Sequence, residues 1–233
     1  MKAMIFAAGL GTRLQHLTQH TPKALVKFGG KPLLEHVIAK LKEVGVDKII
    51  INVHHYAEQI IDFIHANDSG INIQFSIEEN CLLDTGGGLK KASWFFDDEK
   101  PFFIHNVDVQ SDLNLLEMYN FHCRNNALAS LAVRNRDTQR YFLFDKKNRL
   151  CGRENLKINE KILFSEMATS EHLHRFAFSG IHVVSPKIFD YMPKEEIFPI
   201  INLYKNVNKQ VFAYPHDYGK WKDMGKIEDF FDE

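Results

Sequence analysis

The chain has 233 residues, enough for one large domain or two small ones, and its 45% hydrophobic and 25% charged content is that of a globular protein. With a formal net charge of -1 at pH 7, the overall charge does not point to binding of nucleic acid or of an anionic membrane surface. The three cysteines are widely separated, which argues against a disulfide framework or a zinc site and fits a reducing cytosol.

Strand and helix patterns alternate through the first half of the chain. An apolar run over residues 3–8 predicts a buried strand, and amphipathic spacing predicts a helix from Pro32 to Gly45. Strands separated by helices of this length indicate a mostly parallel sheet covered by helices on both faces. The further patterns predict strands over 48–55, 71–77, 101–108 and 127–134, and helices over 56–67, 88–96 and 113–126.

The alternation ends after Asn135. Residues 140–152 predict a hairpin with Lys147 and Asn148 near its turn, and residues 175–185 predict a long strand. We find no internal repeat or linker, so we expect one α/β domain over residues 1–233. The remaining patterns predict a short helix after Pro186, a helix over 195–206, a strand over 210–215 and a C-terminal segment over 220–233.

Two closely spaced glycines, Gly9 and Gly11, follow the first predicted strand. At that place glycine lets the backbone approach an anion, whose charge meets free N–H groups. A dinucleotide-binding turn needs a third glycine where Leu14 stands, and a Walker A loop needs Gly-Lys-Ser/Thr, so neither motif fits. The two glycines alone leave both a tight turn without a ligand and a phosphate-binding loop open.

Two cations near these glycines favour a triphosphate-binding loop. Arg13 and Lys23 lie between residues 10 and 31, a connection that is long and shows no sustained helical period. Glycine backbone combined with arginine and lysine is the set of groups needed to hold a triphosphate.

The order of motifs resembles the sugar-1-phosphate nucleotidyltransferases, also called nucleotide-diphosphate-sugar pyrophosphorylases. Their signature A-A-G-x-G-T-R followed by P-K is present as Ala7 to Arg13 and Pro22-Lys23. The compact length and the D-T-G-G-G segment are most similar to small uridylyltransferases acting on N-acetylmuramic acid 1-phosphate, with mannose-1-phosphate guanylyltransferases as near relatives. Later segments that resemble family motifs are GGKPLLEHVIAKL, LLDTGGGLKKA, FFIHNVDV, FSGIHVVSP and WKDMG.

This resemblance implies a fold and a reaction. The fold would be one Rossmann-like, three-layer α/β/α domain of the GT-A type with a mixed, mostly parallel sheet. Residues 1–110 would form its nucleotide-binding half and residues 111–233 its sugar-phosphate half. In the family reaction, a sugar-1-phosphate oxygen attacks the α-phosphorus of a nucleoside triphosphate and releases pyrophosphate. We expect UTP with N-acetylmuramic acid 1-phosphate, the alternatives being GTP with mannose 1-phosphate and dTTP or UTP with glucose 1-phosphate.

The resemblance also implies roles for individual residues, and Mg²⁺ as the cofactor. The D-T-G-G-G segment would be a loop that closes over the base, although locally it also fits a turn before a helix that begins near Gly88. On their own, Asp108 reads equally as a strand-end or capping acid and Asp223 as a loop carboxylate. The implied catalytic residues are Arg13, Lys23 and Asp108; the metal ligands are Asp108 and Asp223; the nucleotide-binding residues are Ala8, Gly9, Gly11, Thr12, Arg13, Lys23, Thr85, Gly86 and Gly87; and the sugar-binding residues are Asn106, Glu154 and Gly180.

Some positions depart from the family pattern. His16 stands where the family commonly has proline, Val107 replaces the common glycine before the aspartate, and the segment around Glu154 matches poorly. These changes spare the charged groups and put the identity of the substrates in doubt. Two other classes stay open: a catalytically inactive nucleotide-sugar sensor, and a cytidylyltransferase acting on phosphocholine or an alditol phosphate.

Partners and location follow from what the sequence lacks. No stretch reaches the roughly 20 apolar residues of a membrane span, and no basic stripe accompanies the aromatic segments. We therefore expect a cytoplasmic protein whose partners are a nucleoside triphosphate and a sugar 1-phosphate, without nucleic acid or membrane. No hexapeptide repeat follows Asp223, so we expect no acyltransferase activity. The sequence leaves the oligomeric state undetermined.

Overall fold

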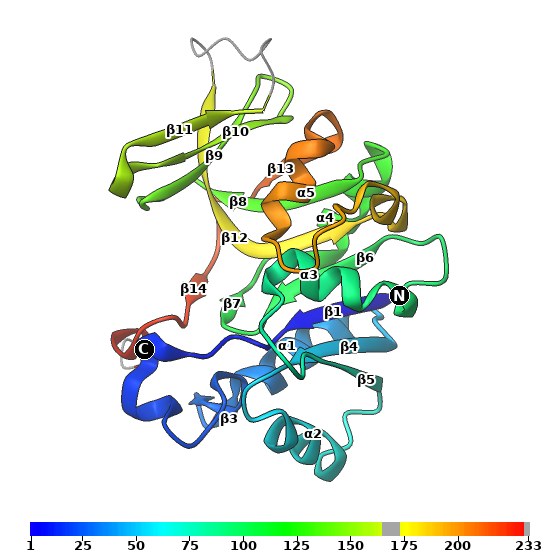
Figure 1. The fold of residues 1–233 in the computed structure, drawn as a ribbon, viewed down its shortest axis with the longest axis vertical. Coiled ribbons are helices and arrows are strands. Elements are labelled where there is room, and N and C mark those ends of the chain that lie inside the picture. Colours follow the sequence, from blue (N-terminus) through cyan, green and yellow to red (C-terminus); the bar gives the residue numbers. More distant parts are fainter. Residues whose placement is uncertain (165–172, 231–233) are drawn as a thin grey trace.

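A mixed sheet runs through the centre of the molecule (Figure 1). The computed structural model describes residues 1–164 and 173–230. Within them the sheet has ten strands, in the order β11-β10-β9-β12-β6-β1-β4-β5, with β8 paired to β12 and β13 to β8. The parallel part comprises β1 (Lys2–Phe6), β4 (Lys48–Val53), β5 (Asn72–Ile77) and β6 (Phe102–Asn106).

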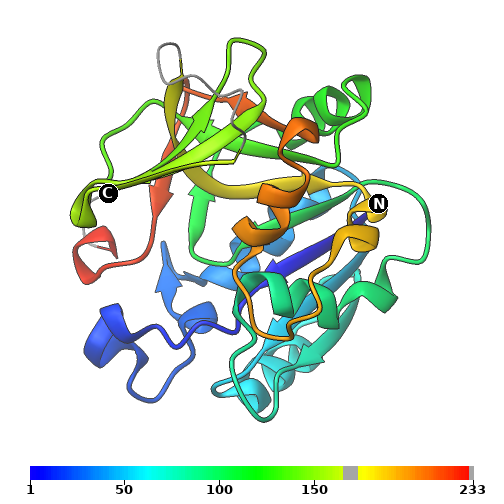
Figure 2. The same ribbon diagram turned by 45° about the horizontal axis from the view of Figure 1, so that its top comes forward.

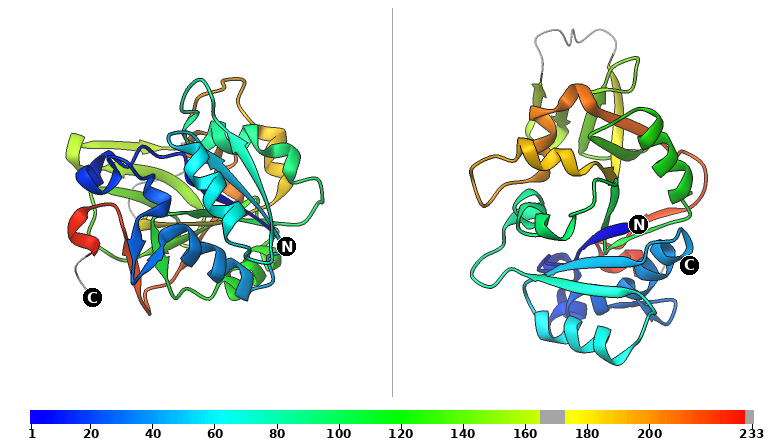
Figure 3. Two further views of the ribbon diagram at one scale, coloured as in Figure 1. Left: turned by 90° about the horizontal axis from the view of Figure 1, so that it is seen from below. Right: turned by 90° about the vertical axis from the view of Figure 1, so that its right-hand side faces the viewer.

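Alternate residues of the parallel strands face two separate cores. Ala3 and Ile5 of β1 pack on one side of the sheet, and Met4 between them packs on the other. The first side is covered by α1 (Leu33–Glu43), α2 (Ala57–Ala66) and α4 (Leu115–Arg124). The second side is covered by α3 (Asp84–Lys91) and α5 (Ile200–Asn206), and Figure 3 shows the sheet between α1 and α4 on one face and α3 and α5 on the other. The predicted α/β class with a mixed central sheet is confirmed.

Helix α1 shows why the sequence pattern was informative. Its five buried residues recur at helical spacing and form one apolar face. Pro32 precedes the first turn, and Gly45 follows the last with a φ of +83°, a conformation that glycine adopts without strain. The helix predicted between these two residues is confirmed.

The second half of the chain extends the sheet with antiparallel strands. The long strand β12 (His174–Val184) pairs with the outer strand β9 through its first three residues and with β8 and β6 through the rest (Figures 1 and 2). The predicted hairpin is confirmed as β9 and β10, with Asn148 at a φ of +57° in its turn. The other strands of this half are β8 (Ala129–Arg134), β9 (Arg140–Phe144), β10 (Leu150–Asn155), β11 (Glu160–Leu163) and β13 (Val211–Pro215).

Several short elements lie outside the sequence prediction. β7 (Val109–Ser111) pairs antiparallel with β14 (Trp221–Asp223), and β2 (Lys27–Phe28) pairs with β3 (Lys31–Pro32). No helix within the described ranges is both long and apolar enough to cross a lipid bilayer. The short 3₁₀ helices are η1 (Thr12–Thr18), η2 (Lys23–Leu25), η3 (Ser93–Phe95), η4 (Leu156–Ile158), η6 (Pro186–Tyr191), η7 (Asn208–Gln210) and η8 (Ile227–Phe230).

Two predicted helix boundaries were wrong. The helix expected over residues 88–96 begins four residues earlier, at Asp84, and gives way to η3 after Lys91. The helix expected from residue 195 begins only at Ile200, directly after Pro199, whose extended backbone precedes the first turn.

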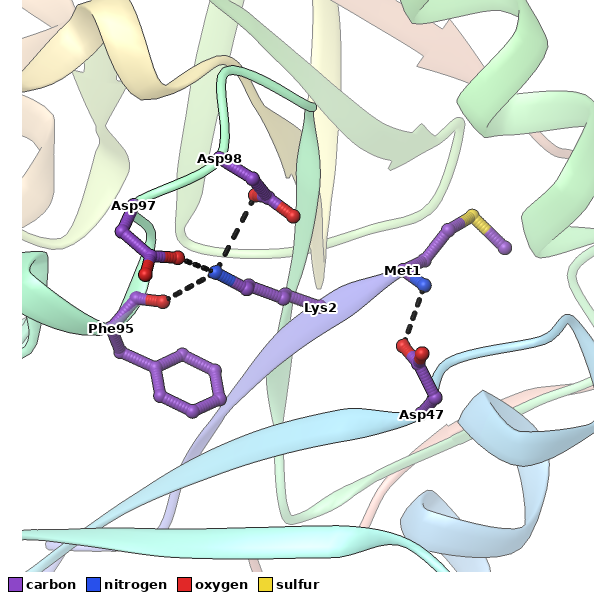
Figure 4. Close-up of polar contacts among 6 residues, drawn as sticks. All are labelled: Met1, Lys2, Asp47, Phe95, Asp97 and Asp98. Carbon is purple, nitrogen blue, oxygen red and sulfur yellow. Dashed lines mark hydrogen bonds and ion pairs between the residues drawn. The ribbon is translucent and has the colours of Figure 1, made fainter.

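A buried lysine fixes the start of β1. The Lys2 side chain is 7% exposed, and its ammonium donates to the carbonyl oxygen of Phe95 at 2.8 Å and pairs with Asp97 (Figure 4). The amino terminus pairs with Asp47 at 2.7 Å. A buried ammonium is tolerated only when it is paired and hydrogen-bonded, so these contacts hold β1 between the segment after η3 and the start of β4.

Four buried histidines make folding sensitive to acid, namely His105, His122, His182 and His216. Burial lowers the pKa of His122 to about 4 and that of His182 to about 3, whereas a histidine in an unfolded chain titrates near 6.5. Below pH 6.5 the unfolded chain therefore binds protons that the folded chain does not. We expect the free energy of unfolding to fall, by about 1.4 kcal/mol per pH unit for each histidine, as the pH drops from about 6.5 to 4. Urea unfolding at pH 7.5, 6 and 5 measures this slope.

A matched pair of variants separates these histidines from other titrating groups. His122→Asn removes one buried imidazole and should reduce the slope, whereas His20→Asn changes an exposed imidazole and should leave it unchanged. An unaltered slope in His122→Asn would contradict the assignment.

Candidate active site

A pocket of about 570 Å³ opens where the parallel strands end. The carboxyl ends of β1 and β6 meet at this edge, which is where open α/β sheets place their ligands. The pocket is lined by Phe6, Ala7, Ala8, Gly9, Gly11, Thr12, Arg13, Lys23, Asn52, Glu78, Leu82, Asp84, Thr85, Asn106, Val107, Asp108, Ile197 and Gly225.

The glycine-rich segment after β1 forms a tight turn into η1. Gly11 has a φ of +65°, and its carbonyl accepts hydrogen bonds from the Leu14 amide at 2.9 Å and the Thr18 hydroxyl at 3.0 Å. A Cβ on Gly11 would lie 2.9 Å from the Thr18 methyl group, so the turn requires glycine. Gly9 has no atom within 4 Å of its would-be Cβ, which leaves the backbone accessible from the pocket.

The two predicted cations lie on this segment. Arg13 is exposed, and its guanidinium lies against Gly225, whose would-be Cβ would be 2.9 Å from one terminal nitrogen. Lys23 begins η2, is 10% exposed and forms an ion pair with Asp108. The structure therefore brings both cations to the pocket wall that carries Asp108.

The pairing of β14 with β7 brings the second aspartate to the same place. Asp223 is in register with Val109, one residue beyond Asp108, and the Met224 amide donates to the Asp108 carbonyl at 2.7 Å. Burial raises the pKa of Asp223, and the charge of Asp108 adds to this rise, against the effect of Lys23 and Arg13. The negative charge of Asp108 is thus close enough to disfavour ionisation of Asp223.

This pair fits a divalent cation. The Oδ1 atom of Asp223 is buried and has no hydrogen-bond partner within the described part of the chain. No group of three possible metal ligands occurs within residues 1–164 and 173–230. Mg²⁺ commonly uses one or two carboxylates and takes its other ligands from phosphates and water. The predicted magnesium site stays a prediction, and the donor set is compatible with it.

A buried hydrogen-bond chain in the wall of the pocket was not predicted. The Ala7 amide donates to Asn52 Oδ1 at 2.9 Å, and Asn52 Nδ2 donates to Glu78 Oε1 at 2.8 Å. Glu78 Oε2 accepts from the Leu83 amide at 2.9 Å. These bonds link the end of β1 to β4 and to the segment before α3. The available signal was an asparagine in the apolar strand KIIINV.

The D-T-G-G-G segment differs from the prediction. It is the first turn of α3 and not a loop, because packing against residues 196–198 overrides the low helix propensity of glycine. The amides of Gly86 and Gly87 donate to the Phe198 carbonyl at 2.9 and 3.1 Å, so they are already bonded inside the protein. Of the three residues predicted to contact the base, Thr85 lines the pocket.

The three predicted sugar contacts have different positions. Asn106 ends β6 and lines the pocket. Gly180 lies behind it in an irregularity of β12, with a φ of +76° and its would-be Cβ 3.1 Å from Asn106 Nδ2. Glu154 lies on β10, in an ion pair of 2.7 Å with Arg175, and is not among the residues that line the pocket.

Comparison with known proteins assigns the chain to a family. The profile described as nucleotidyl transferase matches residues 2–233. The chain belongs to this family. The resemblance of motifs is thereby confirmed, along with the mixed α/β fold that it implied.

Individual relatives carry different substrates in their names. A mannose-1-phosphate guanyltransferase from Yarrowia lipolytica is 32% identical over 240 residues, covering 99% of this chain and 62% of that protein. A UTP–glucose-1-phosphate uridylyltransferase from Synechocystis is 30% identical over 251 residues, with the same coverage of 99% and 62%. This chain therefore spans about 62% of the length of these relatives. The crystal structure of HddC from Yersinia pseudotuberculosis has a TM-score of 0.78 at 22% identity, covering 99% and 96%, which supports the fold.

The glycines of α3 and of the first turn should respond differently to alanine. In Gly87→Ala the new methyl group would overlap the carbonyl oxygen of Glu196, and we expect the free energy of unfolding to fall by about 1–3 kcal/mol. In Gly9→Ala the methyl group meets no atom within 4 Å, and the change should stay within about 0.5 kcal/mol. Urea unfolding measures both. Equal stability of the two variants would contradict this expectation and would show that the backbone at Glu196 can move to admit the methyl group.

Proposed function

We propose that this chain transfers a nucleotidyl group from a nucleoside triphosphate to a sugar 1-phosphate and releases pyrophosphate. The observation that carries the proposal is that Arg13, Lys23 and Asp108 line one pocket at the carboxyl edge of the sheet, and that the pairing of β14 with β7 brings Asp223 beside Asp108. The two cationic side chains complement the negative charge of a triphosphate, and the two carboxylates complement the divalent cation that accompanies it.

Catalysis of this reaction consists mainly of positioning and charge neutralisation, because both reactants are anions. An oxygen of the sugar phosphate attacks the α-phosphorus, and the bond from that phosphorus to the bridging oxygen breaks as pyrophosphate leaves. Arg13 would hold the triphosphate and balance the charge of the departing pyrophosphate. Lys23 would leave Asp108 to hold the α-phosphate or the incoming sugar phosphate. Asp108 and Asp223 would hold Mg²⁺, which when bound neutralises phosphate charge.

For the substrates we propose UTP with N-acetylmuramic acid 1-phosphate, on the similarity of the D-T-G-G-G segment to that class. The relative from Yarrowia lipolytica, at 32% identity, favours GTP with mannose 1-phosphate as the second candidate. The relative from Synechocystis, at 30% identity, makes UTP with glucose 1-phosphate a third.

Pyrophosphate release with defined substrates tests the proposal. The purified chain with Mg²⁺ is incubated with UTP, dTTP, GTP or CTP and with the 1-phosphates of N-acetylmuramic acid, N-acetylglucosamine, glucose or mannose. We expect one pair to release pyrophosphate and to lose activity at least a hundredfold in Asp223→Asn and on chelation with EDTA. Phosphocholine with CTP serves as the outgroup. Nucleotide binding without turnover of any pair would replace the transferase by a nucleotide-binding sensor.

Arg13 should not tolerate a change to lysine. A planar guanidinium holds two phosphate oxygens together, whereas an ammonium is a point charge. We expect Arg13→Lys to lower kcat/KM about 10- to 100-fold, with unchanged stability because the side chain is exposed. Arg140→Lys, an exposed change on β9 outside the pocket, is the matched control. Comparable kcat/KM values for the two variants would remove Arg13 from the site.

A further inference from the structure

The segment before α5 is fastened along α3. We call residues 193–200 the strap. The ammonium of Lys90, on α3, donates to three successive strap carbonyls, those of Pro193, Lys194 and Glu195, at 2.8, 3.1 and 3.0 Å. One side chain of α3 thereby holds the first part of the strap.

The second part of the strap is bonded to the start of α3. The Phe198 amide donates to the Leu83 carbonyl at 3.2 Å, and the Phe198 carbonyl accepts from the amides of Gly86 and Gly87. The Ile200 amide donates to the Thr85 hydroxyl oxygen at 2.9 Å. These bonds fix the strap backbone on both sides of Ile197.

The glycines of α3 make this contact possible. A Cβ on Gly86 would overlap the Phe198 ring and lie 2.8 Å from its carbonyl oxygen, and a Cβ on Gly87 would overlap the Glu196 carbonyl oxygen. Phe198 is 4% exposed, so its ring is anchored in the core. These two glycines therefore allow the close approach of the strap, and their contact with a base stays a prediction.

The anchored strap leaves one large apolar side chain at the pocket. Ile197 is 56% exposed and lines the pocket together with Leu82, although its neighbour Phe198 is buried. An exposed isoleucine costs little when alone, but one fixed at a pocket wall offers a preformed apolar surface to a ligand. Its backbone is held, so little conformational entropy is lost on contact.

The two predicted cations and Ile197 come from different elements of the pocket wall. Arg13 lies on η1 and Lys23 on η2, whereas Ile197 lies on the strap, which is bonded to the start of α3. A nucleotide with its phosphates on the two cations would leave its uncharged ring for the rest of the lining, which includes Leu82 and Ile197.

We infer that Ile197 is an apolar wall on which the nucleobase of the substrate packs. This inference rests on the proposed function, since it takes the pocket's ligand to be a nucleoside triphosphate. Apolar packing is non-directional, so Ile197 would strengthen binding of any base that enters and would leave the choice among bases to polar groups.

Truncation of Ile197 tests the inference. Isothermal titration calorimetry with Mg²⁺ measures the Kd of Ile197→Ala for UTP, for GTP and for inorganic tripolyphosphate, which has no base. We expect the Kd of the nucleotides to rise about tenfold and that of tripolyphosphate to stay unchanged. With an active substrate pair, KM for the nucleotide should rise while kcat is unchanged. Ile197→Leu should restore binding.

Ile158→Ala is the matched control, because Ile158 is 63% exposed and lies on η4 outside the pocket lining. Unaltered nucleotide binding in Ile197→Ala, with turnover intact, would overturn the inference and leave the proposed function standing. An equal loss for nucleotide and tripolyphosphate would also overturn it, since a wall for the base does not act on phosphate. Failure of the wild-type chain to bind any nucleotide would overturn both proposals.

Discussion

The candidate site depends on one antiparallel contact, the pairing of β7 with β14. This contact places Asp223, from the last part of the chain, beside Asp108 at the end of a core strand. Two carboxylates in partly buried positions repel one another, and burial alone already raises the pKa of Asp223. Such an arrangement is unfavourable unless positive charge is close, which accounts for the nearness of Arg13 and Lys23. The free energy gained by packing in the rest of the fold has to offset the repulsion between these carboxylates.

The helices and strands that the sequence predicted are those with a clear local pattern of apolar residues. The repeated apolar face of α1, between Pro32 and Gly45, defines that helix without help from the rest of the chain. β7 and β14 have three residues each, too few to show a period, and their pairing depends on contacts far apart in sequence. For the same reason Asp108 and Asp223 could be joined only through resemblance to a family, since neither carries a local sign of the other.

The glycines of α3 show where local reasoning fails. Three consecutive glycines disfavour a helix, by about 1 kcal/mol each relative to alanine, and the local pattern predicted a turn before a helix that begins near Gly88. The strap supplies what the sequence window does not contain, a buried Phe198 ring and carbonyl oxygens that occupy the space of the missing side chains. The same limitation explains why the link from Ala7 through Asn52 to Glu78 was missed, because its members come from three separate segments.

In the ion pair between Lys23 and Asp108, the carboxylate of Asp108 is the counterion of the Lys23 ammonium. A phosphate that binds Lys23 must compete with this carboxylate, so binding exchanges one partner for another. Any cation that engages Asp108 frees the ammonium and so raises its affinity for a polyanion. By thermodynamic reciprocity, the polyanion must strengthen the hold of the cation by the same factor. One lysine shared between two partners is thus sufficient to couple the binding of a cation to the binding of a polyanion.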